Sequence, residues 1–372
     1  MKPYGLYIHI PFCENKCPYC DFFSVKGDVF EKRKYIDALK KYINHYSNKN
    51  LSISSVYFGG GTPTVLESTD LCEILNCIKN SFNLLYDAEI SFEANPNTVD
   101  FKYLKNLVSG GFNRISFGVQ SLDEQQLKSL GRKHSAKEAV SKIKLAKEAG
   151  FNNISADLML GVPGQTTKSL KQTLEKLTTY EINHVSAYML KIEEGTPFFQ
   201  QKDSLQIADE EILSQMYLIT VDFLNNKGFK QYEISNFAKE GYECRHNLIY
   251  WQCEEYLAFG PSAYFYYKNK RGHFSKSLEE FIFNAQHDKF EPIFDENGGD
   301  LFEYFILNLR LSKGVNLKYL KQKYNVDTKN LIKKAESLEK NNLLKINNDN
   351  INLTKEGFLL SNEIIAVLSN QL

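Results

Sequence analysis

"YIHIPFCENKCPYCDFFS", residues 7–24, contains the feature that decides the fold, because Cys13, Cys17 and Cys20 follow one another in a C-x3-C-x2-C spacing. Residues 4–10 alternate apolar and polar side chains, which predicts a β-strand that leads directly into the cysteine loop. Three thiols this close cannot form unstrained disulfides with each other, but they can converge on one metal centre. A [4Fe–4S] cluster usually takes four cysteine ligands, so three would leave one iron open.

Structural zinc is the alternative for this triplet, with His9 or Cys244 as the fourth ligand. Structural zinc sites usually combine two paired spacings, and the chain has no second C-x2-C. Three buried or free cysteines without a metal are a further alternative, which the tight clustering disfavours. The triplet therefore favours an iron–sulfur site with an open iron.

Length, composition and charge limit the class of protein. The chain has 372 residues, 42% of them hydrophobic, enough for one large domain and one or two small ones. Its 45 basic and 45 acidic residues give no global argument for nucleic acid or an anionic membrane as a partner. We expect no secretory signal at residues 1–12 and no membrane span, which would need ~20 apolar residues. Seven cysteines, an odd number, fit a reducing cytoplasm better than a disulfide framework.

Strand and helix patterns alternate along the first half of the chain, which predicts parallel βα units. "GFNRIS" (111–116) and "GFNNIS" (150–155) repeat where a helix ends and a strand begins, as expected in a barrel or part-barrel. Strands are expected at residues 4–10, 54–63, 88–97, 114–121, 153–166 and 184–190. Helices are expected at about 29–47, 67–80, 98–108, 135–149 and 168–179.

Most predicted strands end in glycine or polar residues, at 59–62, Glu93, Gln120 and Asp157. In βα barrels the active site lies at the carboxyl ends of the strands. Solvent-exposed loops would also be polar, but the recurrence of such residues at successive strand ends favours a functional rim.

Three parts are predicted along the chain: a partial barrel over 1–195, a mixed region over 196–299 and a C-terminal domain over 300–372. The C-terminal part combines short helices with a hairpin at 343–354 and a last helix at about 355–369, which resembles a winged-helix module. The predicted fold class is α/β, a (β/α)6 partial TIM-type barrel with a mixed α+β region and a small winged-helix-like domain.

The cysteine spacing after a first strand, with an aromatic at Tyr19, resembles the radical S-adenosylmethionine superfamily. The resemblance implies a [4Fe–4S] cluster bound by Cys13, Cys17 and Cys20, with S-adenosylmethionine on the fourth iron. It also implies an electron donor, because electron transfer from the cluster splits S-adenosylmethionine to a 5′-deoxyadenosyl radical. The protein would supply ligation, orientation and exclusion of oxygen and water.

Further motifs, in order along nearly the whole chain, resemble the oxygen-independent coproporphyrinogen oxidase family. The resemblance implies that "GGGTP" at 59–63 meets the methionyl amino group, while Arg132 suits the methionyl carboxylate and carboxylates suit ribose hydroxyls. Met159 would pack against the adenine. The implied S-adenosylmethionine contacts are Tyr7, Tyr19, Gly60, Gly61, Thr62, Glu93, Gln120, Arg132 and Asp157.

Two branches share this scaffold. One decarboxylates the propionates of coproporphyrinogen III, and the other, the HemW-like heme chaperones, binds heme and delivers it to acceptor proteins. The oxidase has a further cysteine where this chain has Phe22, and an N-terminal extension for which a strand beginning near residue 4 leaves no room. "HNLIYW", 246–251, matches the H-N-x-x-Y-W signature of the HemW-like branch. The chain therefore resembles that branch.

His246 is the candidate heme contact in this motif, because its imidazole could reach heme iron. Tyr250 and Trp251 could pack against the porphyrin face. A histidine with satisfied hydrogen bonds beside core aromatics is the alternative. The flanking Cys244 and Cys253 are assigned no role.

The C-terminal part has nine lysines and three acids between residues 313 and 345. A basic winged-helix shape suggests nucleic-acid binding as a function. A solvated lysine-rich face explains the charge more simply, so no nucleic acid is expected. The charge is also compatible with a weak contact with the cytoplasmic face of a membrane.

The resulting hypothesis is a cytoplasmic heme chaperone that transfers heme to respiratory membrane proteins such as cytochromes. Its cofactors would be a [4Fe–4S] cluster and S-adenosylmethionine, its cargo heme and its further partner an electron donor. No catalytic residue is assigned, and a homodimer is compatible with the sequence. The first alternative is an oxygen-independent coproporphyrinogen III dehydrogenase. The second is a nucleic-acid-binding or scaffold protein with a structural cluster.

Overall fold

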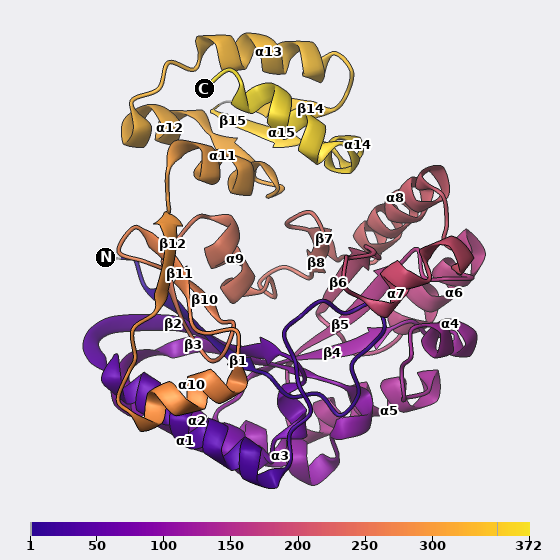
Figure 1. Cartoon of the computed structure of the whole chain (residues 1–372). Helices are drawn as coiled ribbons and strands as arrows, with labels where there is room; N and C mark the ends of the chain where they lie inside the picture. Colours follow the sequence, from indigo (N-terminus) through magenta and orange to yellow (C-terminus); the bar gives the residue numbers. More distant parts are fainter. Residues whose placement is uncertain (1, 348) are drawn as a thin grey trace.

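The computed structural model describes residues 2–347 and 349–372. Parallel strands lie side by side in chain order at the centre of a 12-stranded mixed sheet (Figure 1). The last of them pairs with a later antiparallel strand and not with β1, so the sheet curves without closing into a barrel. The parallel strands are β1 (Tyr4–Ile10), β2 (Asn48–Gly60), β3 (Phe82–Ala94), β4 (Arg114–Gln120), β5 (Asn153–Leu160) and β6 (His184–Met189).

Helices connect these strands and cover the outer face of the sheet (Figure 1). The predicted α/β partial barrel is thereby confirmed, with strands β2 and β3 each beginning six residues earlier than the sequence pattern indicated and one short helix, α4, not predicted. The connecting helices are α1 (Val29–His45), α2 (Ser68–Ser81), α3 (Phe101–Gly110), α4 (Glu124–Ser129), α5 (Ala136–Ala149) and α6 (Thr167–Leu177).

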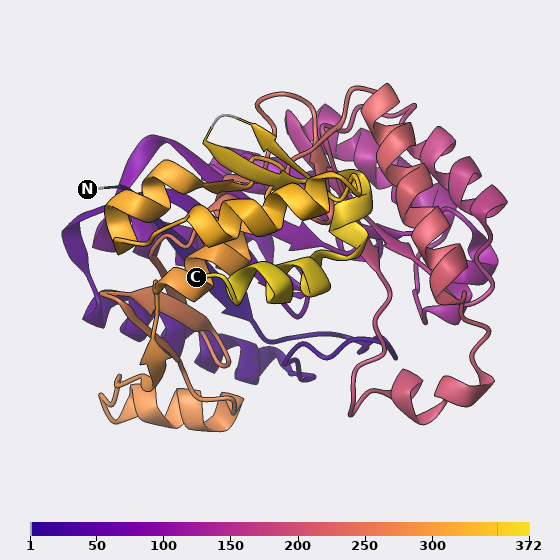
Figure 2. The same ribbon diagram turned by 90° about the horizontal axis from the view of Figure 1, so that it is seen from above.

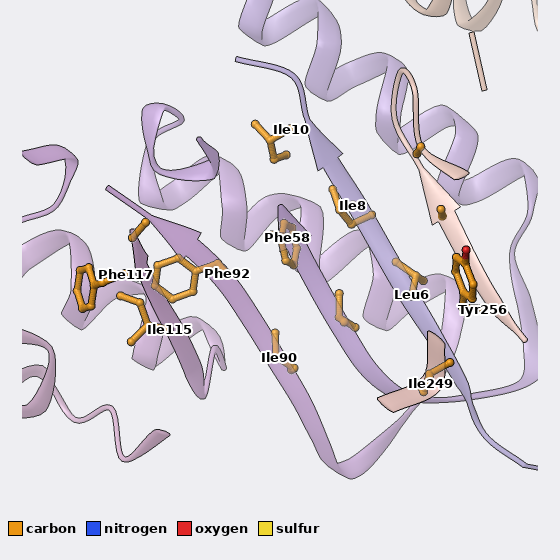
Figure 3. Close-up of a cluster of buried hydrophobic side chains, with 14 of the residues drawn as sticks. Leu6, Ile8, Ile10, Phe58, Ile90, Phe92, Ile115, Phe117, Ile249 and Tyr256 are labelled. Carbon is orange, nitrogen blue, oxygen red and sulfur yellow. The ribbon is translucent and has the colours of Figure 1, made fainter. Parts of the chain in front are cut away.

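Apolar side chains of the strands point outward and pack under the helices, as the alternation in each strand requires. Leu6, Ile8 and Ile10 of β1 are fully buried and lie beside Phe58 and Phe92 of the neighbouring strands (Figure 3). The alternate positions point into the part-barrel and are mostly polar. A closed barrel fills its interior with branched apolar side chains, so this polar inner face marks a ligand cavity rather than a core.

The two GFN repeats explain how the helices return to the sheet. Gly111 and Gly150 end α3 and α5 in the left-handed conformation, with φ of 105° and 116°. Glycine takes this conformation without the steric cost of a Cβ. The next residues, Phe112 and Phe151, are buried and begin the return to the core.

Residues of the predicted mixed region extend the same sheet at both edges. β9 is parallel to β1, and β10 to β12 continue antiparallel from it, while β8 and β7 continue from β6. The 17-residue helix α8 was not predicted from the sequence. The elements are α7 (Pro197–Gln200), α8 (Glu210–Asn226), β7 (Lys230–Gln231), β8 (Asn236–Ala238), α9 (Arg245–Trp251), β9 (Tyr256–Phe259), β10 (Tyr264–Tyr267), β11 (Lys270–His273), α10 (Leu278–Gln286) and β12 (Ile293–Asn297).

The C-terminal part has the predicted helices and hairpin, with residue 348 of the hairpin outside the described residues. The single last helix predicted at about 355–369 is divided at Leu360 into two helices. Viewed from above, it lies across the part-barrel (Figure 2), and it contacts α8 and α9. Its small sheet has the order β13-β15-β14. The elements are α11 (Leu301–Leu309), β13 (Val315–Asn316), α12 (Leu317–Tyr324), α13 (Lys329–Glu339), β14 (Leu344–Asn347), β15 (Asn350–Leu353), α14 (Lys355–Leu359) and α15 (Ser361–Ser369).

A search of the helices in the described residues for one long and apolar enough to cross a membrane finds none.

Candidate functional site

A cavity of about 390 Å³ extends from the cysteine loop into the polar interior of the part-barrel. Its volume is in the range of small-molecule sites, and strands β2 to β6 all contribute side chains to its wall. All but two of the predicted site residues line it: Cys13, Cys17, Tyr19, Cys20, Gly60, Gly61, Thr62, Glu93, Gln120, Arg132 and Asp157.

The cysteine loop is held in place by backbone hydrogen bonds. Cys13 N–H donates to Val25 O (3.0 Å), and Val25 N–H donates to Pro11 O (2.7 Å), which joins the two ends of the loop. Inside the loop, Cys20 N–H donates to Cys17 O (3.1 Å). Phe198 N–H donates to Pro18 O (3.0 Å), which ties the middle of the loop to α7. The three thiols are therefore fixed on the cavity wall, partly exposed and not joined in disulfides.

The turn at the end of β2, Gly60 to Thr62, packs against the beginning of the cysteine loop. Gly61 N–H donates to Ile10 O and Thr62 N–H donates to Phe12 O, both at 2.8 Å. A Cβ on Gly61 would lie 2.5 Å from Phe12 O, and one on Gly60 would lie 2.7 Å from the His9 ring, so both glycines are required for this close approach. The N–H groups of Gly61 and Thr62 are thus used by the backbone. Contact with a ligand's amino group would fall to carbonyl oxygens of this turn.

Arg132 connects the cysteine loop to the strand ends. One guanidinium nitrogen donates to Cys17 Sγ (3.5 Å), and the other donates to Asn95 Oδ1 (2.5 Å) and Gly118 O (2.7 Å). Asn95 in turn donates to Thr62 Oγ1 (3.1 Å), whose hydroxyl lies 3.5 Å from Cys13 Sγ. This chain of contacts places a fixed positive charge against the cysteine loop.

Two carboxyl groups lie on the cavity wall where the alternation of β3 and β5 turns them inward. Glu93 accepts a hydrogen bond from Tyr57 OH (2.8 Å), and Asp157 accepts one from Ser116 Oγ (3.0 Å). Burial raises the pKa of Glu93 to about 7 and raises the pKa of Asp157 above its usual value. Both groups can accept hydrogen bonds from hydroxyls of a ligand. At the end of β4, Gln120 lines the same wall with a φ of +64°, unusual for a residue with a side chain.

Tyr7 and His246 are the predicted site residues that do not line the cavity. Tyr7 OH lies 3.1 Å from His9 Nδ1. His246 is 1% exposed and lies against Gly5 of β1, at the opposite end of the strand from the cysteine loop. Its Nδ1 is 2.8 Å from Ser55 Oγ and its Nε2 is 2.7 Å from Tyr250 OH. For Nε2 to form an axial bond to heme iron, its hydrogen bond with Tyr250 OH would have to break.

Sequence reasoning missed the residues at the inner end of the cavity. Arg114, Ser116, His184, Cys244 and Asn247 line it there. Arg114 and Ser116 share the inward alternation of Gln120 along β4, a signal that could have found them. Cys244 and Asn247 come from the beginning of α9, far along the chain. Asn247 belongs to the HNLIYW motif, a signal that could have found it, whereas Cys244 has no such signal.

The site fits an iron–sulfur cluster better than a single ion. Among residues 2–347 and 349–372, no three His, Cys, Asp or Glu side chains are grouped closely enough to bind one metal ion. In a cluster each thiolate binds a different iron, so the sulfurs surround the cluster and do not converge on one point. The predicted fourth zinc ligands are also engaged: His9 with Tyr7 OH and Phe23 O (2.9 Å), and Cys244 with Glu89 Oε1 (3.6 Å). Three thiols, a cationic neighbour and an adjoining cavity suit a cluster with an open iron.

Comparisons with known proteins agree with this geometry. The profile of the Radical SAM superfamily matches residues 7–177, and that of the HemN C-terminal domain matches residues 300–360. The heme chaperone HemW of Bacillus subtilis is 34% identical over 98% of this chain and 99% of its own length. The protein of the same name from Buchnera aphidicola (Schizaphis graminum) is 33% identical over 99% of this chain and 98% of its own length.

Among solved structures, coproporphyrinogen III oxidase (HemN) from Escherichia coli superposes with a TM-score of 0.85. The alignment covers 100% of this chain and 91% of that one, at 22% sequence identity. At this identity the likeness shows a shared fold alone.

Proposed function

This chain belongs to the HemW-like family of the radical S-adenosylmethionine superfamily, and we propose that it is a heme chaperone that passes heme to respiratory heme proteins. The observation that carries the proposal is the similarity over nearly the whole length to proteins named heme chaperones. The "HNLIYW" motif and the phenylalanine at position 22 support the same branch. We further propose that delivery takes place at the cytoplasmic face of a membrane.

We propose that Cys13, Cys17 and Cys20 hold a [4Fe–4S] cluster at the mouth of the cavity. When bound, this cluster and S-adenosylmethionine supply one-electron chemistry. The chain's own part is to fix the three sulfurs through the loop hydrogen bonds and to place Arg132 beside Cys17. A guanidinium at this point offers its charge to a carboxylate of a ligand.

Binding of S-adenosylmethionine is proposed for the wall next to the cysteines. Glu93 and Asp157 would accept hydrogen bonds from ribose hydroxyls, while Gln120, Tyr19 and Met159 form the surrounding wall. The turn at Gly60, Gly61 and Thr62 would offer carbonyl oxygens to the amino group. Tyr7 and His246 stay predictions, because neither reaches the cavity wall in this conformation.

Transfer to an acceptor is the experiment that tests this function. Anaerobic heme-loaded protein is mixed with an apo-cytochrome of the b type, and the two are separated on an affinity tag. Movement of heme to the acceptor faster than from heme-loaded serum albumin supports the proposal. Transfer no faster than from albumin contradicts it.

Incubation with coproporphyrinogen III, S-adenosylmethionine and a reductant tests the enzyme alternative. The proposal expects no protoporphyrinogen, and its appearance at a catalytic rate would overturn the chaperone assignment.

A further inference from the structure

We propose that Arg114 binds a carboxylate of the cargo, a propionate of heme, at the inner end of the cavity. This inference rests on the proposed function and adds a location and an orientation for the heme. A porphyrin is a large apolar ring with carboxylates at one edge, so a buried cation fixes which edge enters first.

Arg114 is a buried cation without a partner of its own. Its side chain projects from the beginning of β4 into the part-barrel, is 2% exposed and lines the cavity. Its Nε is buried without any hydrogen-bond partner, and no described residue forms an ion pair or side-chain hydrogen bond with its guanidinium. Burial penalises the charge of this guanidinium, and the nearby groups, Glu89 among them, offset that penalty only from longer range than a hydrogen bond. A carboxylate from a ligand would give the guanidinium a direct partner.

Nearby acids do not supply this partner. Glu89 accepts from the backbone N–H groups of Arg245 (3.2 Å) and His246 (3.3 Å). Glu93 and Asp157 accept from Tyr57 and Ser116, as described above. None of the three carboxylates lies within the 4.0 Å ion-pair limit of the guanidinium, although all are close enough to feel its charge. The alternative is that Arg114 only balances these acids at longer range.

The neighbouring histidine that lines this end of the cavity also has no free nitrogen. His184 Nδ1 lies 2.8 Å from Ser155 Oγ, and its Nε2 lies 2.8 Å from Tyr232 OH. The Arg114 guanidinium is the cation at this end of the cavity, and no described residue accepts a hydrogen bond from it. Guanidinium binds a carboxylate through two parallel N–H donors, which matches the end of a propionate.

Esterified heme tests the assignment on the unmodified protein. Heme and its dimethyl ester, in which both propionates are blocked, are each titrated into the cluster-free protein at the same detergent concentration. Binding is measured as quenching of the fluorescence of Trp251, the one tryptophan of the sequence. We expect the ester to bind at least about tenfold more weakly to the wild type, the range for a charged hydrogen bond. In Arg114→Met, heme and ester should bind equally. Arg33→Met, on the outer face of α1, is the matched control and should keep the wild-type preference for heme.

Three results would overturn the assignment. The first is equal binding of heme and ester by the wild type, and the second is an unchanged preference for heme in Arg114→Met. In the third, Arg114→Met loses affinity for S-adenosylmethionine but not for heme, which would assign the carboxylate to S-adenosylmethionine. Failure of the proposed function looks different, because the wild type would then bind neither heme nor ester, and the Arg114 assignment would fall with it.

Discussion

Replacement of His246 by Phe tests whether the histidine of the HNLIYW motif is held in a buried hydrogen-bond network. The imidazole is 1% exposed, stacks on Tyr57 with ring centroids 5.3 Å apart, and bonds Ser55 and Tyr250 through its two nitrogens. Phenylalanine keeps the stacked ring but leaves both hydroxyls unpaired in the interior. Each unpaired buried group costs about 1–3 kcal/mol, so the free energy of unfolding should fall by roughly 2–6 kcal/mol at pH 7.5.

The pH dependence gives the same network a second signature. Burial and the neighbouring Arg114 charge lower the pKa of His246 to about 3, against an ordinary value of 6.5. The unfolded chain therefore binds a proton below pH 6.5 that the folded chain does not, and stability falls as pH decreases from 6.5 towards 3. The contribution of His246 is about 1.4 kcal/mol for each pH unit in that window. His246→Phe has no imidazole to protonate. The difference in free energy of unfolding between wild type and variant should therefore be about 1.4 kcal/mol smaller at pH 5.5 than at pH 7.5.

Urea unfolding of the cluster-free protein at pH 7.5 and 5.5 measures both effects. The single-hydroxyl variant Tyr250→Phe serves as the control, since it removes only one of the two bonds and should cost less. Other buried groups that titrate nearby, such as His184 and Glu93, are common to all three proteins and cancel in the differences. A loss below 0.5 kcal/mol at pH 7.5, within the usual effect of a surface substitution, would refute the buried network. If the stability difference between wild type and His246→Phe is the same at pH 5.5 as at pH 7.5, the lowered pKa of His246 is refuted.

The remaining predictions concern the cluster and the motif. Replacing Cys13, Cys17 or Cys20 by Ala should abolish the broad absorbance of the reconstituted cluster, and a full cluster in any one variant would remove that residue from the ligand set. Gly61→Ala places a methyl group 2.5 Å from Phe12 O and should displace the cysteine loop, lowering iron content per protein while the far-ultraviolet circular dichroism stays unchanged; full iron content would contradict the fit of loop and turn. His246→Ala should weaken heme binding or transfer with iron and sulfide content retained, and unchanged heme affinity and delivery would make His246 a core residue only.

Local pattern was enough to predict the parallel strands and the cavity wall. Alternation in Tyr4–Ile10 and Arg114–Gln120 separates an apolar outer face from a polar inner one, and the strand ends at Glu93 and Asp157 then fall on one rim. The cysteine triplet needed no tertiary information, because its three cysteines lie within one loop.

Contacts between distant segments could not be predicted from the sequence. His246 is bonded to Ser55, which is 191 residues away, so no local pattern could tell whether its nitrogens were free. Arg114 was not predicted as a site residue because it stands at the beginning of β4, whereas the functional residues of βα barrels are expected at the carboxyl ends of strands. The strands from β9 to β12 were missed as parts of the main sheet, because strands this short acquire their register only from their neighbours: β9 pairs with β1, and β10, β11 and β12 pair outward from it in turn.

A heme titration of the wild-type protein, with and without S-adenosylmethionine, tests the central claim most directly. The account predicts saturable binding of one heme per chain at micromolar concentration, seen as a shifted Soret band after subtraction of the cluster spectrum. No Soret shift at micromolar heme in either condition, with the cluster intact, would contradict it.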